Sequence, residues 1–438
     1  AEHLETAGDL HPAYGWHMRA AGWAVNRDIG AARLSWERAA KIADALLADD
    51  PGCAAMCIPP RTMLCATAHR VDVDVAGDRF DELRELCTAV GDDASLAIAM
   101  AGLLMDDAWQ DRLPEASRLA SEVWALVESI GDPTLMVGLS VPVLYAKLEC
   151  AEWRDVLDWS QRVIDLAAGS PTMGDFLFGS PLALALTTRA WARYWLGRPG
   201  WRDDQRHGLA MARSVEPLSY VTVVTYVYPS GIPNGVLRPD ASALREIEDG
   251  LLIAERSGDA VALNYARGSL GLALVHRESD AERDRGYALL TEVSDAALLR
   301  RHNLCDRPLI EAYAAREQAR RGDRDGAIAS MRAVVDHLFR DGPRLLHGVA
   351  ATGVLVETLI DRGSDDDLSE AAAAVSRVAD VRSGGELFVR DVWLLRWRAL
   401  LARAHGDEAG YRRHRDRYRD MAAAHGFEGH LAWAEALP

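Results

Sequence analysis

Helical periodicity runs through nearly the whole chain and limits the folds that it can adopt. Segments of about 15 to 20 residues place apolar side chains at i, i+3, i+4 and i+7, which is typical of amphipathic helices. Gly-Asp dipeptides separate them, and glycine ends one helix in the left-handed conformation while aspartate caps the next. These dipeptides are Gly8-Asp9, Gly77-Asp78, Gly91-Asp92, Gly131-Asp132, Gly258-Asp259, Gly322-Asp323 and Gly406-Asp407. The sequence therefore predicts an all-α fold of antiparallel helices.

The second helix of each predicted pair repeats one spacing of small and large apolar residues. The spacing occurs at Ala32, Trp36 and Ala39, at Ala116, Ala120 and Val123, and at Ala327, Met331 and Val334. It places a small residue where two helices approach closely and a larger one in the gap beside it. In the first pair the preceding helix adds Trp16, Ala20 and Trp23. The pattern resembles that of tetratricopeptide repeats, with degenerate spacing.

A stacked array of these pairs is the predicted architecture, since one pair alone cannot bury both of its apolar faces. With a repeat of roughly 40 residues, the chain predicts a right-handed superhelix, an α-solenoid, of about twenty helices. We expect residues 1–438 to form a single helical-repeat domain with an irregular break near 216–240. In that break, the run "SYVTVVTYVYPSGIPNGVL" at 219–237 predicts a buried, irregular helix that ends in a loop.

Aromatic residues before and within this break are the predicted ligand or partner site. Proline and glycine interrupt the helix there, and broken stacking exposes backbone groups and aromatic faces. Packing of the same rings between irregular helices is the alternative. The candidate residues are Trp191, Tyr194, Trp195, Tyr220, Tyr226 and Tyr228.

Composition and motifs argue against several classes of function. A formal charge of −17 opposes the long-range attraction that nucleic acid or an anionic membrane needs. Lys41 and Lys147 are the only lysines, and neither lies in a phosphate-binding loop. The sequence has no hydrolase, zincin, kinase or dinucleotide-binding motif, so we expect no catalytic residue and no cofactor. It has neither a membrane span nor a signal peptide, which favours a cytoplasmic location.

No metal site is expected from the sequence. The six cysteines lack paired C-x-x-C spacing, and Cys53 and Cys57 are interpreted as reduced thiols although they could form one edge of a metal site. Acidic runs at 364–370 and near Asp280 are interpreted as solvated helix starts. The basic segment "YRRHRDRYRD" at 411–420 suggests nucleic acid, but its aspartates favour the solvated face of a terminal helix.

Longer phrases of the sequence resemble the C-terminal region of mycobacterial multidomain nucleotide cyclases. The phrases are "AYGWHMRAAGWAVNRDIGAARLSWERAAKIADAL", "PPRTMLCATAHRV", "LGRPGWRDDQRHGLAMARS", "GIPNGVLRPD", "DVWLLRWRALLARAHGD" and "GFEGHLAWAEALP". In that family a class III adenylate/guanylate cyclase domain precedes a P-loop signalling ATPase and a long helical-repeat region. The resemblance implies that the cyclase and ATPase lie elsewhere in a parent polypeptide. The start of the chain, Ala1 within a predicted helix, is in keeping with this expectation.

Three hypotheses for function follow. The first is a non-enzymatic regulatory or sensor module that binds a protein segment or a small effector on its concave face and acts on the attached cyclase and ATPase. The second is a free-standing scaffold for protein partners with no cyclase connection. The third, an enzyme with an unrecognised site, would need convergent polar groups in a pocket. The sequence leaves the effector, the direction of regulation and the oligomeric state open.

Overall fold

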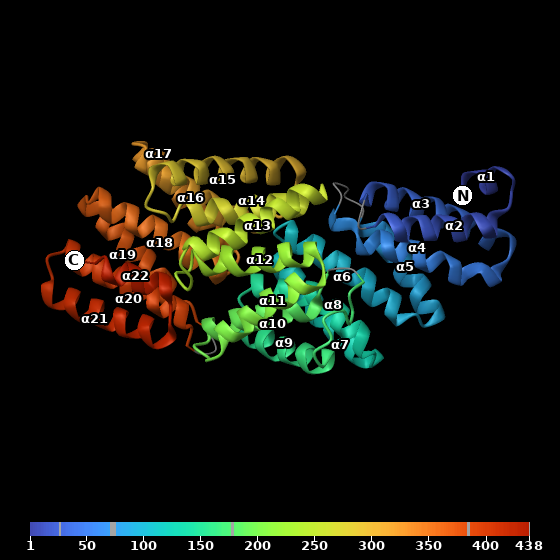
Figure 1. Ribbon diagram of the computed structural model, residues 1–438, viewed down its shortest axis with the longest axis horizontal. Coiled ribbons are helices and arrows are strands. Elements are labelled where there is room, and N and C mark those ends of the chain that lie inside the picture. Colours follow the sequence, from blue (N-terminus) through green and yellow to red (C-terminus); the bar gives the residue numbers. More distant parts are fainter. Residues whose placement is uncertain (26–27, 71–75, 177–178, 383–385, 438) are drawn as a thin grey trace. The chain divides into compact units, whose positions relative to one another are not determined.

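The computed structural model describes residues 1–25, 28–70, 76–176, 179–382 and 386–437. Helices make up all the regular secondary structure of these residues (Figure 1). The chain divides into two compact units, Ala1–Ala146 (unit 1) and Lys147–Pro438 (unit 2). The all-α prediction is confirmed. The single-domain prediction and the hand of the superhelix stay predictions.

Unit 1 begins with a short helix and continues through longer helices and two 3₁₀ turns. Its elements are α1 (Glu2–Thr6), α2 (Leu10–Ala24), α3 (Ile29–Asp49), η1 (Pro51–Cys57), α4 (Ile58–Ala66), η2 (Ala68–Arg70), α5 (Ala76–Val90), α6 (Asp93–Trp109), α7 (Leu113–Ile130) and most of α8 (Pro133–Glu149). Within it α2 packs on α3, α4 on α6, and α6 on α7.

Unit 2 starts in the last turn of α8 and is a longer run of helices of similar length. Its elements are α9 (Trp153–Ala167), α10 (Pro181–Trp195), α11 (Trp201–Val215), α12 (Pro217–Gly231), α13 (Ala241–Ser257), α14 (Ala260–Leu274), α15 (Asp280–Arg300), α16 (Arg307–Arg320), α17 (Arg324–Arg340), α18 (Leu345–Arg362), α19 (Asp365–Ala379), α20 (Phe388–Ala404), α21 (Glu408–His425) and α22 (Glu428–Glu435).

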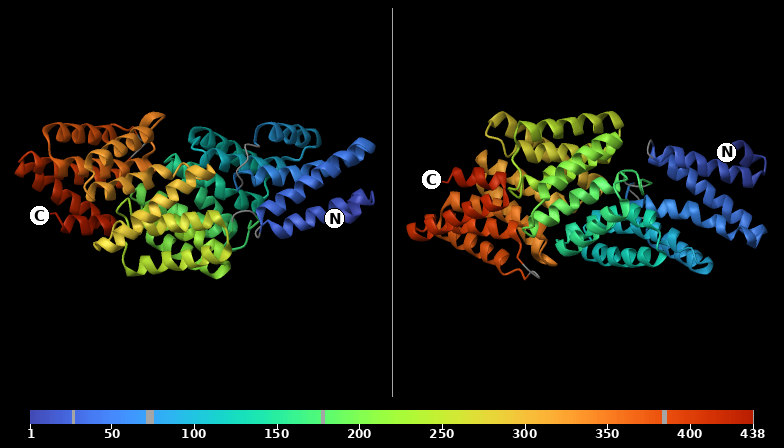
Figure 2. Two further views of the ribbon diagram at one scale, coloured as in Figure 1. Left: turned by 90° about the horizontal axis from the view of Figure 1, so that it is seen from above. Right: turned by 60° about the horizontal axis from the view of Figure 1, so that its bottom comes forward.

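Packing between these helices follows the order of a helical-repeat array. Each helix from α9 to α21 packs against the next one in sequence, so neighbours form antiparallel pairs (Figure 2). The even-numbered helices from α10 to α20 also contact one another in turn, as the first helices of successive pairs do in a stack. This arrangement confirms the α-solenoid class of tetratricopeptide-like helix pairs.

Gly-Asp dipeptides end and begin helices as predicted at six of their seven positions. Gly131 and Gly258 adopt the left-handed conformation, and the Asp132 and Asp259 carboxylates accept backbone N–H bonds from the following turn. The prediction is wrong at 77–78, which lie inside α5. Aspartate is also favoured in the first turn of a helix, where it complements the dipole, so the dipeptide does not require a boundary.

The repeated spacing identifies buried positions correctly in the second helices and incorrectly in the first helix. Every residue of the three aligned sets is buried, and Trp36 is only 2% exposed. In contrast, Trp16 and Trp23 are 52% and 66% exposed, and Ala20 is also exposed. The buried face of α2 consists of Ala13, His17, Ala21 and Ala24. The predicted register of α2 is therefore wrong. Its small residues face α3, where Trp36 already fills the gap.

The β-like run at 219–237 forms the helix and loop that the sequence predicts. It lies in α12, which contains Pro229 and ends at Gly231. The following residues make a turn in which Ile232, Asn234 and Val236 are buried. The Gly235 and Val236 carbonyls accept hydrogen bonds from the backbone N–H groups at the start of α22. The C-terminal helix therefore covers this loop.

Candidate functional site

The aromatic residues predicted as a binding site lie on α10 and α12, and Trp191, Tyr194, Trp195 and Tyr226 pack against other rings. Trp195 stacks on Trp153 with ring centroids 4.7 Å apart, and the Tyr194 hydroxyl lies 3.0 Å from Ser230 Oγ. Five of the six side chains are buried, and Tyr226 is half-buried. Their use as a binding surface stays a prediction.

The other two tyrosines use their hydroxyl groups within the fold. Tyr220 accepts a hydrogen bond from Arg213, and Tyr228 donates to Glu246 over 2.7 Å. Burial raises the pKa of both hydroxyls, so both are neutral at physiological pH. These two residues therefore join α12 to its neighbours.

At the basic end of the chain, Arg415 of α21 packs over the Tyr411 ring, with 5.4 Å from the guanidinium carbon to the ring centroid. Tyr411 and Tyr418 are buried, with exposed fractions of 5% and 0%, while Arg412 and Arg419 are exposed. Arg415 pairs with the neighbouring Asp416 over 2.9 Å. A base could not stack on either tyrosine, which favours the interpretation as a solvated helix face.

A pocket of about 330 Å³ lies in unit 2, among α16, α18, α20, α22 and the turn after α14. Its wall contains more cations than carboxylates, and several aromatic rings. The cations are Arg277, Arg316, Arg320, Arg324 and Arg396, and the carboxylates are Glu357 and Asp361. The rings belong to His276, Tyr313, Trp393 and Trp433. Such a lining is unusual for a chain of charge −17.

Helical spacing accounts for the gathering of these side chains. Tyr313, Arg316 and Arg320 follow one another at i, i+3 and i+7 on α16, so they share a face. On α18, Gly353 leaves room for a ring, since a Cβ there would lie 2.9 Å from the Trp393 ring. The sequence analysis missed this pocket. The arginine spacing on α16 was visible, but its proximity to α20 and α22 was not.

Arg396 is the most firmly held cation of the pocket. Its Nε and Nη2 atoms donate to the two Glu357 oxygens over 2.8 and 3.0 Å, and its guanidinium lies 5.3 Å from the Trp433 ring centroid. Burial alone would lower the pKa of Arg396, but the Glu357 carboxylate outweighs it and the pKa is raised. Arg396 therefore stays charged within an aromatic wall.

Positive charges crowd one another on the α16 side of the pocket. Burial, followed by the neighbouring Arg316, lowers the pKa of Arg320, even though Arg320 donates to the buried Glu317 over 2.8 Å. An anion placed here would relieve this repulsion, because an opposite charge favours the charged form of a base.

His276 supplies an acceptor among these donors. Its Nδ1 lies 2.7 Å from the Leu272 carbonyl oxygen, and Nε2 is buried with no hydrogen-bond partner among the described residues. Burial and then Arg316 hold the pKa of His276 well below its usual value, so the ring is neutral. Nδ1 carries the proton and Nε2 can accept one hydrogen bond. Trp393 Nε1, also buried without a partner in the described ranges, offers a donor.

The pocket can therefore bind an anionic group and hold an apolar or planar part against its rings. Guanidinium groups recognise carboxylates and phosphates through paired N–H donors.

Comparisons with known proteins do not assign the chain to a protein family, so its structural class is taken from its own fold. No protein-family model matches the chain, and no curated protein matches it. The crystal structure of yeast Tom70 is 12% identical, covers 99% of this chain and 93% of its own, and has a TM-score of 0.33. A circular tandem repeat protein with novel repeat topology and enhanced subunit contact surfaces is 15% identical, covers 98% of this chain and 99% of its own, and has a TM-score of 0.17. Scores this low carry no argument about function.

The packed helix pairs define a tetratricopeptide-like helical-repeat protein, the class in which stacked pairs form a surface for partners. Within the described residues, no helix has both the length and the apolar character needed to cross a lipid bilayer.

Proposed function

We propose that the chain is a non-catalytic interaction module whose unit 2 pocket binds an acidic peptide segment. The observation that carries this proposal is the crowding of guanidinium groups beside aromatic rings in the pocket. A carboxylate on the partner would pair with Arg316 and Arg320, and an adjoining side chain would lie against Trp433. A protein partner fits better than a nucleic acid, since the rest of the chain repels polyanions.

In its parent polypeptide, we propose that this module regulates class III adenylate/guanylate cyclase and signalling ATPase domains in the cytoplasm. The sequence resemblance supports this role, and the pocket supplies a place where an effector segment could act. The alternative is a free-standing scaffold unrelated to a cyclase. A genomic reading frame that continues upstream into cyclase and ATPase sequences would exclude that alternative.

Binding can be tested with a short labelled peptide in which two glutamates adjoin one phenylalanine, followed by fluorescence anisotropy at low and high salt. We expect the double variant R316A/R320A to bind at least about tenfold more weakly, a loss of about 1.4 kcal/mol, and added salt to weaken wild-type binding. Arg419→Ala, which changes an exposed arginine of α21, is the matched control. Equal affinity of wild type and the double variant would reject the pocket.

The same titration distinguishes this pocket from the aromatic site predicted near the break. Tyr226→Phe leaves the ring in place and removes only the hydroxyl, so the proposal expects unchanged peptide affinity. A loss confined to this variant would favour the site on α10 and α12.

Regulation requires a separate measurement on the parent protein. We expect R316A/R320A to change the response of cyclase output to the effector segment while leaving basal output unaltered. Identical output with and without the repeat region under every effector tried would reject the regulatory role, even if the peptide binds.

A further inference from the structure

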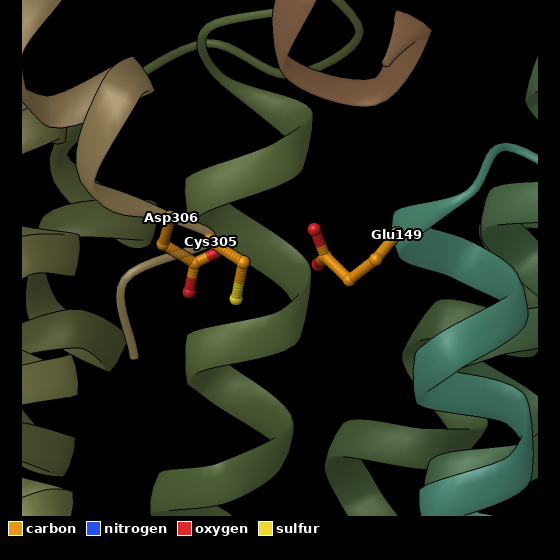
Figure 3. Close-up of side chains that lie close together, drawn as sticks. All are labelled: Glu149, Cys305 and Asp306. Carbon is orange, nitrogen blue, oxygen red and sulfur yellow. The ribbon is translucent and has the colours of Figure 1, made fainter. Parts of the chain in front are cut away.

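Three elements of unit 2 bring four potential metal ligands to one place. Glu149 is the last residue of α8, Cys305 and Asp306 lie directly before α16, and His347 is in the first turn of α18. One ligand atom each from Glu149, Cys305 and Asp306 lies within 4.8 Å of the others. Figure 3 shows the Glu149 carboxylate extending from its helix toward the Cys305 thiol and Asp306.

His347 lies against two members of this cluster and pairs with both. Its Nε2 lies 3.2 Å from Glu149 Oε2 and 3.2 Å from Asp306 Oδ1. One N–H can be shared between two acceptors, and 3.2 Å is at the long end of N–H to O hydrogen-bond distances. Zinc bonds of about 2.0 Å at tetrahedral angles hold N and O ligands about 3.3 Å apart. The distances of His347 Nε2 to the two carboxylates therefore fit ligation of one ion as well as a shared hydrogen bond.

Burial makes the charge of this cluster costly unless a cation balances it. Glu149, Cys305 and His347 are 3%, 0% and 7% exposed. Isolated carboxylates are rarely buried without a paired charge or a metal. Arg344 donates to the Cys305 carbonyl oxygen over 3.0 Å and supplies one positive charge. With a thiolate, two carboxylates, a neutral imidazole and Arg344, a divalent ion brings the net charge to zero.

Asn303 fixes the direction of one ligand, the Asp306 carboxylate, as outer partners do at protein metal sites. Asn303 Nδ2 donates to Asp306 Oδ2 over 2.7 Å, which leaves Oδ1 for the cluster. Cys305 Sγ donates to Asn303 Oδ1 over 3.2 Å, a bond that the thiol gives up on metal binding, and Asn303 has a φ of 55°. Asparagine tolerates this left-handed conformation better than most residues. The turn therefore presents Cys305 and Asp306 together.

We propose that Glu149, Cys305, Asp306 and His347 form a tetrahedral site for a zinc ion. A set of one sulfur, one nitrogen and two oxygens suits zinc, whereas calcium and magnesium prefer oxygen alone. On binding, Cys305 loses its thiol proton and any proton on His347 Nε2, and both go to solvent. Four protein ligands close the site to substrate, so the zinc fastens the end of α8 to the starts of α16 and α18.

A buried ion triad without metal is the competing explanation. In it an imidazolium, shared between the two carboxylates, replaces the zinc. Burial lowers the pKa of His347, but Glu149 and Asp306 outweigh it and raise that pKa to about 9 in the metal-free protein. In the triad Cys305 keeps its thiol proton and donates to Asn303, whereas in the zinc site its sulfur is a ligand.

Metal content of the full chain separates the two explanations. After expression with zinc and exhaustive dialysis, inductively coupled plasma mass spectrometry is expected to find about one zinc per wild-type chain. C305S/H347Q is expected to hold less than about a tenth of that amount while keeping its helical circular dichroism. Cys87→Ser, which removes a buried thiol from unit 1, is the control and should retain the zinc. A wild-type chain without zinc, or equal zinc in wild type and C305S/H347Q, would overturn the proposal.

A second readout needs no folded variant. Cobalt(II) added to chelator-treated wild type is expected to give intense visible bands of a tetrahedral site and a thiolate-to-metal charge-transfer band in the near ultraviolet. Zinc should bleach both. Absence of the thiolate band would overturn the assignment of Cys305.

Discussion

At the scale of single residues, two tryptophans of unit 1 show how register decides stability. Trp36 is 2% exposed and packs with Ala21, Ala32 and Leu64, whereas Trp16 is 52% exposed with the Arg19 guanidinium 4.1 Å from its ring centroid. Both residues lie in the first helix pair. Because only Trp36 fills a gap between helices, only Trp36 removes a large apolar area from water.

Replacing Trp36 by alanine should therefore lower the free energy of unfolding by about 3 to 5 kcal/mol. The reason is the cavity left between α2, α3 and α4. Trp16→Ala is the matched control and should cost less than about 0.5 kcal/mol. Urea unfolding followed by circular dichroism measures both. Similar costs for the two variants would mean that the register of α2 differs from the one described.

A second residue-scale contribution is the cap of α19, where Ser364 and Asp367 form a reciprocal capping box. Asp367 is 2% exposed, and its Oδ2 accepts from Arg362 Nε over 2.9 Å. The Arg362 hydrogen bond, followed by the Ser364 contacts, outweighs burial and holds the pKa of Asp367 well below its usual value. The carboxylate therefore stabilises the fold as long as it is ionised.

The stabilisation by Asp367 should be present above the ordinary aspartate pKa of about 3.9 and should disappear as the pH falls toward its lower folded-state pKa. At pH 7, Asp367→Asn should cost about 1 to 2 kcal/mol, mostly through the lost cap and ion pair. Unfolding of wild type and variant between pH 7 and pH 3 measures this. A stability difference that does not shrink in acid would contradict the assigned role. Asp365→Asn, exposed in the same turn, is the control.

At the scale of elements, the loop after α12 and helix α22 depend on each other. Gly235 has a φ of +68°, and its Cβ would lie 2.6 Å from the Trp433 ring and 2.7 Å from the His430 ring. The His430 N–H donates to the Gly235 carbonyl over 2.8 Å. Glycine is required here by conformation and by space.

Gly235→Ala should therefore destabilise unit 2 by about 3 kcal/mol or more, since left-handed strain and overpacking add together. Gly406→Ala isolates the strain alone, because Gly406 has a φ of +75° but nothing within 4 Å of its Cβ position. That control should cost about 1 to 2 kcal/mol. Thermal unfolding compares the two. Equal losses would show that α22 does not press on the loop.

Sequence reasoning succeeded for elements whose signal is local. The helix start at Asp280 and the turn at Gly258 depend on nearby residues, and the sequence predicts both, as it predicts a helix that ends in a loop within 219–237. The register of α2 failed because Trp16 and Trp23 follow helical spacing as well as Ala13 and Ala24 do. Periodicity identifies a face, and only the partner helix decides which face is covered.

The two places where function is proposed were out of reach for a related reason. The pocket joins α16 to α20 and α22, and the metal cluster joins Glu149 to Cys305 and His347, which are far apart in sequence. No spacing rule connects such residues, because the packing of the array sets their distance. Tyr226 is one of the six aromatic residues predicted as a site, and it is close enough to the metal cluster to be affected by its charges. Burial, and then the charges of Glu149 and Asp306, raise the pKa of its hydroxyl.

At the scale of the whole molecule, each unit has its own buried core. In unit 1, Trp36 belongs to a cluster formed by α2, α3 and α4, while the core of unit 2 includes Trp195 and Trp397, both fully buried. Helical-repeat proteins gain stability from interactions between neighbouring pairs, so cooperativity can break down along a long array. The two units therefore need not unfold together.

We expect two unfolding transitions in urea, each sensitive to substitutions in one unit only. Trp36→Ala should lower the midpoint of one transition and Gly235→Ala that of the other, because each variant removes contacts from a single core. Zinc should raise only the transition that Gly235→Ala lowers, since a ligand stabilises the folded state that binds it. Circular dichroism resolves the two steps, and the double variant W36A/G235A should show both shifts unchanged. If each single variant moves one common transition, the chain unfolds as the single cooperative domain that its sequence predicts.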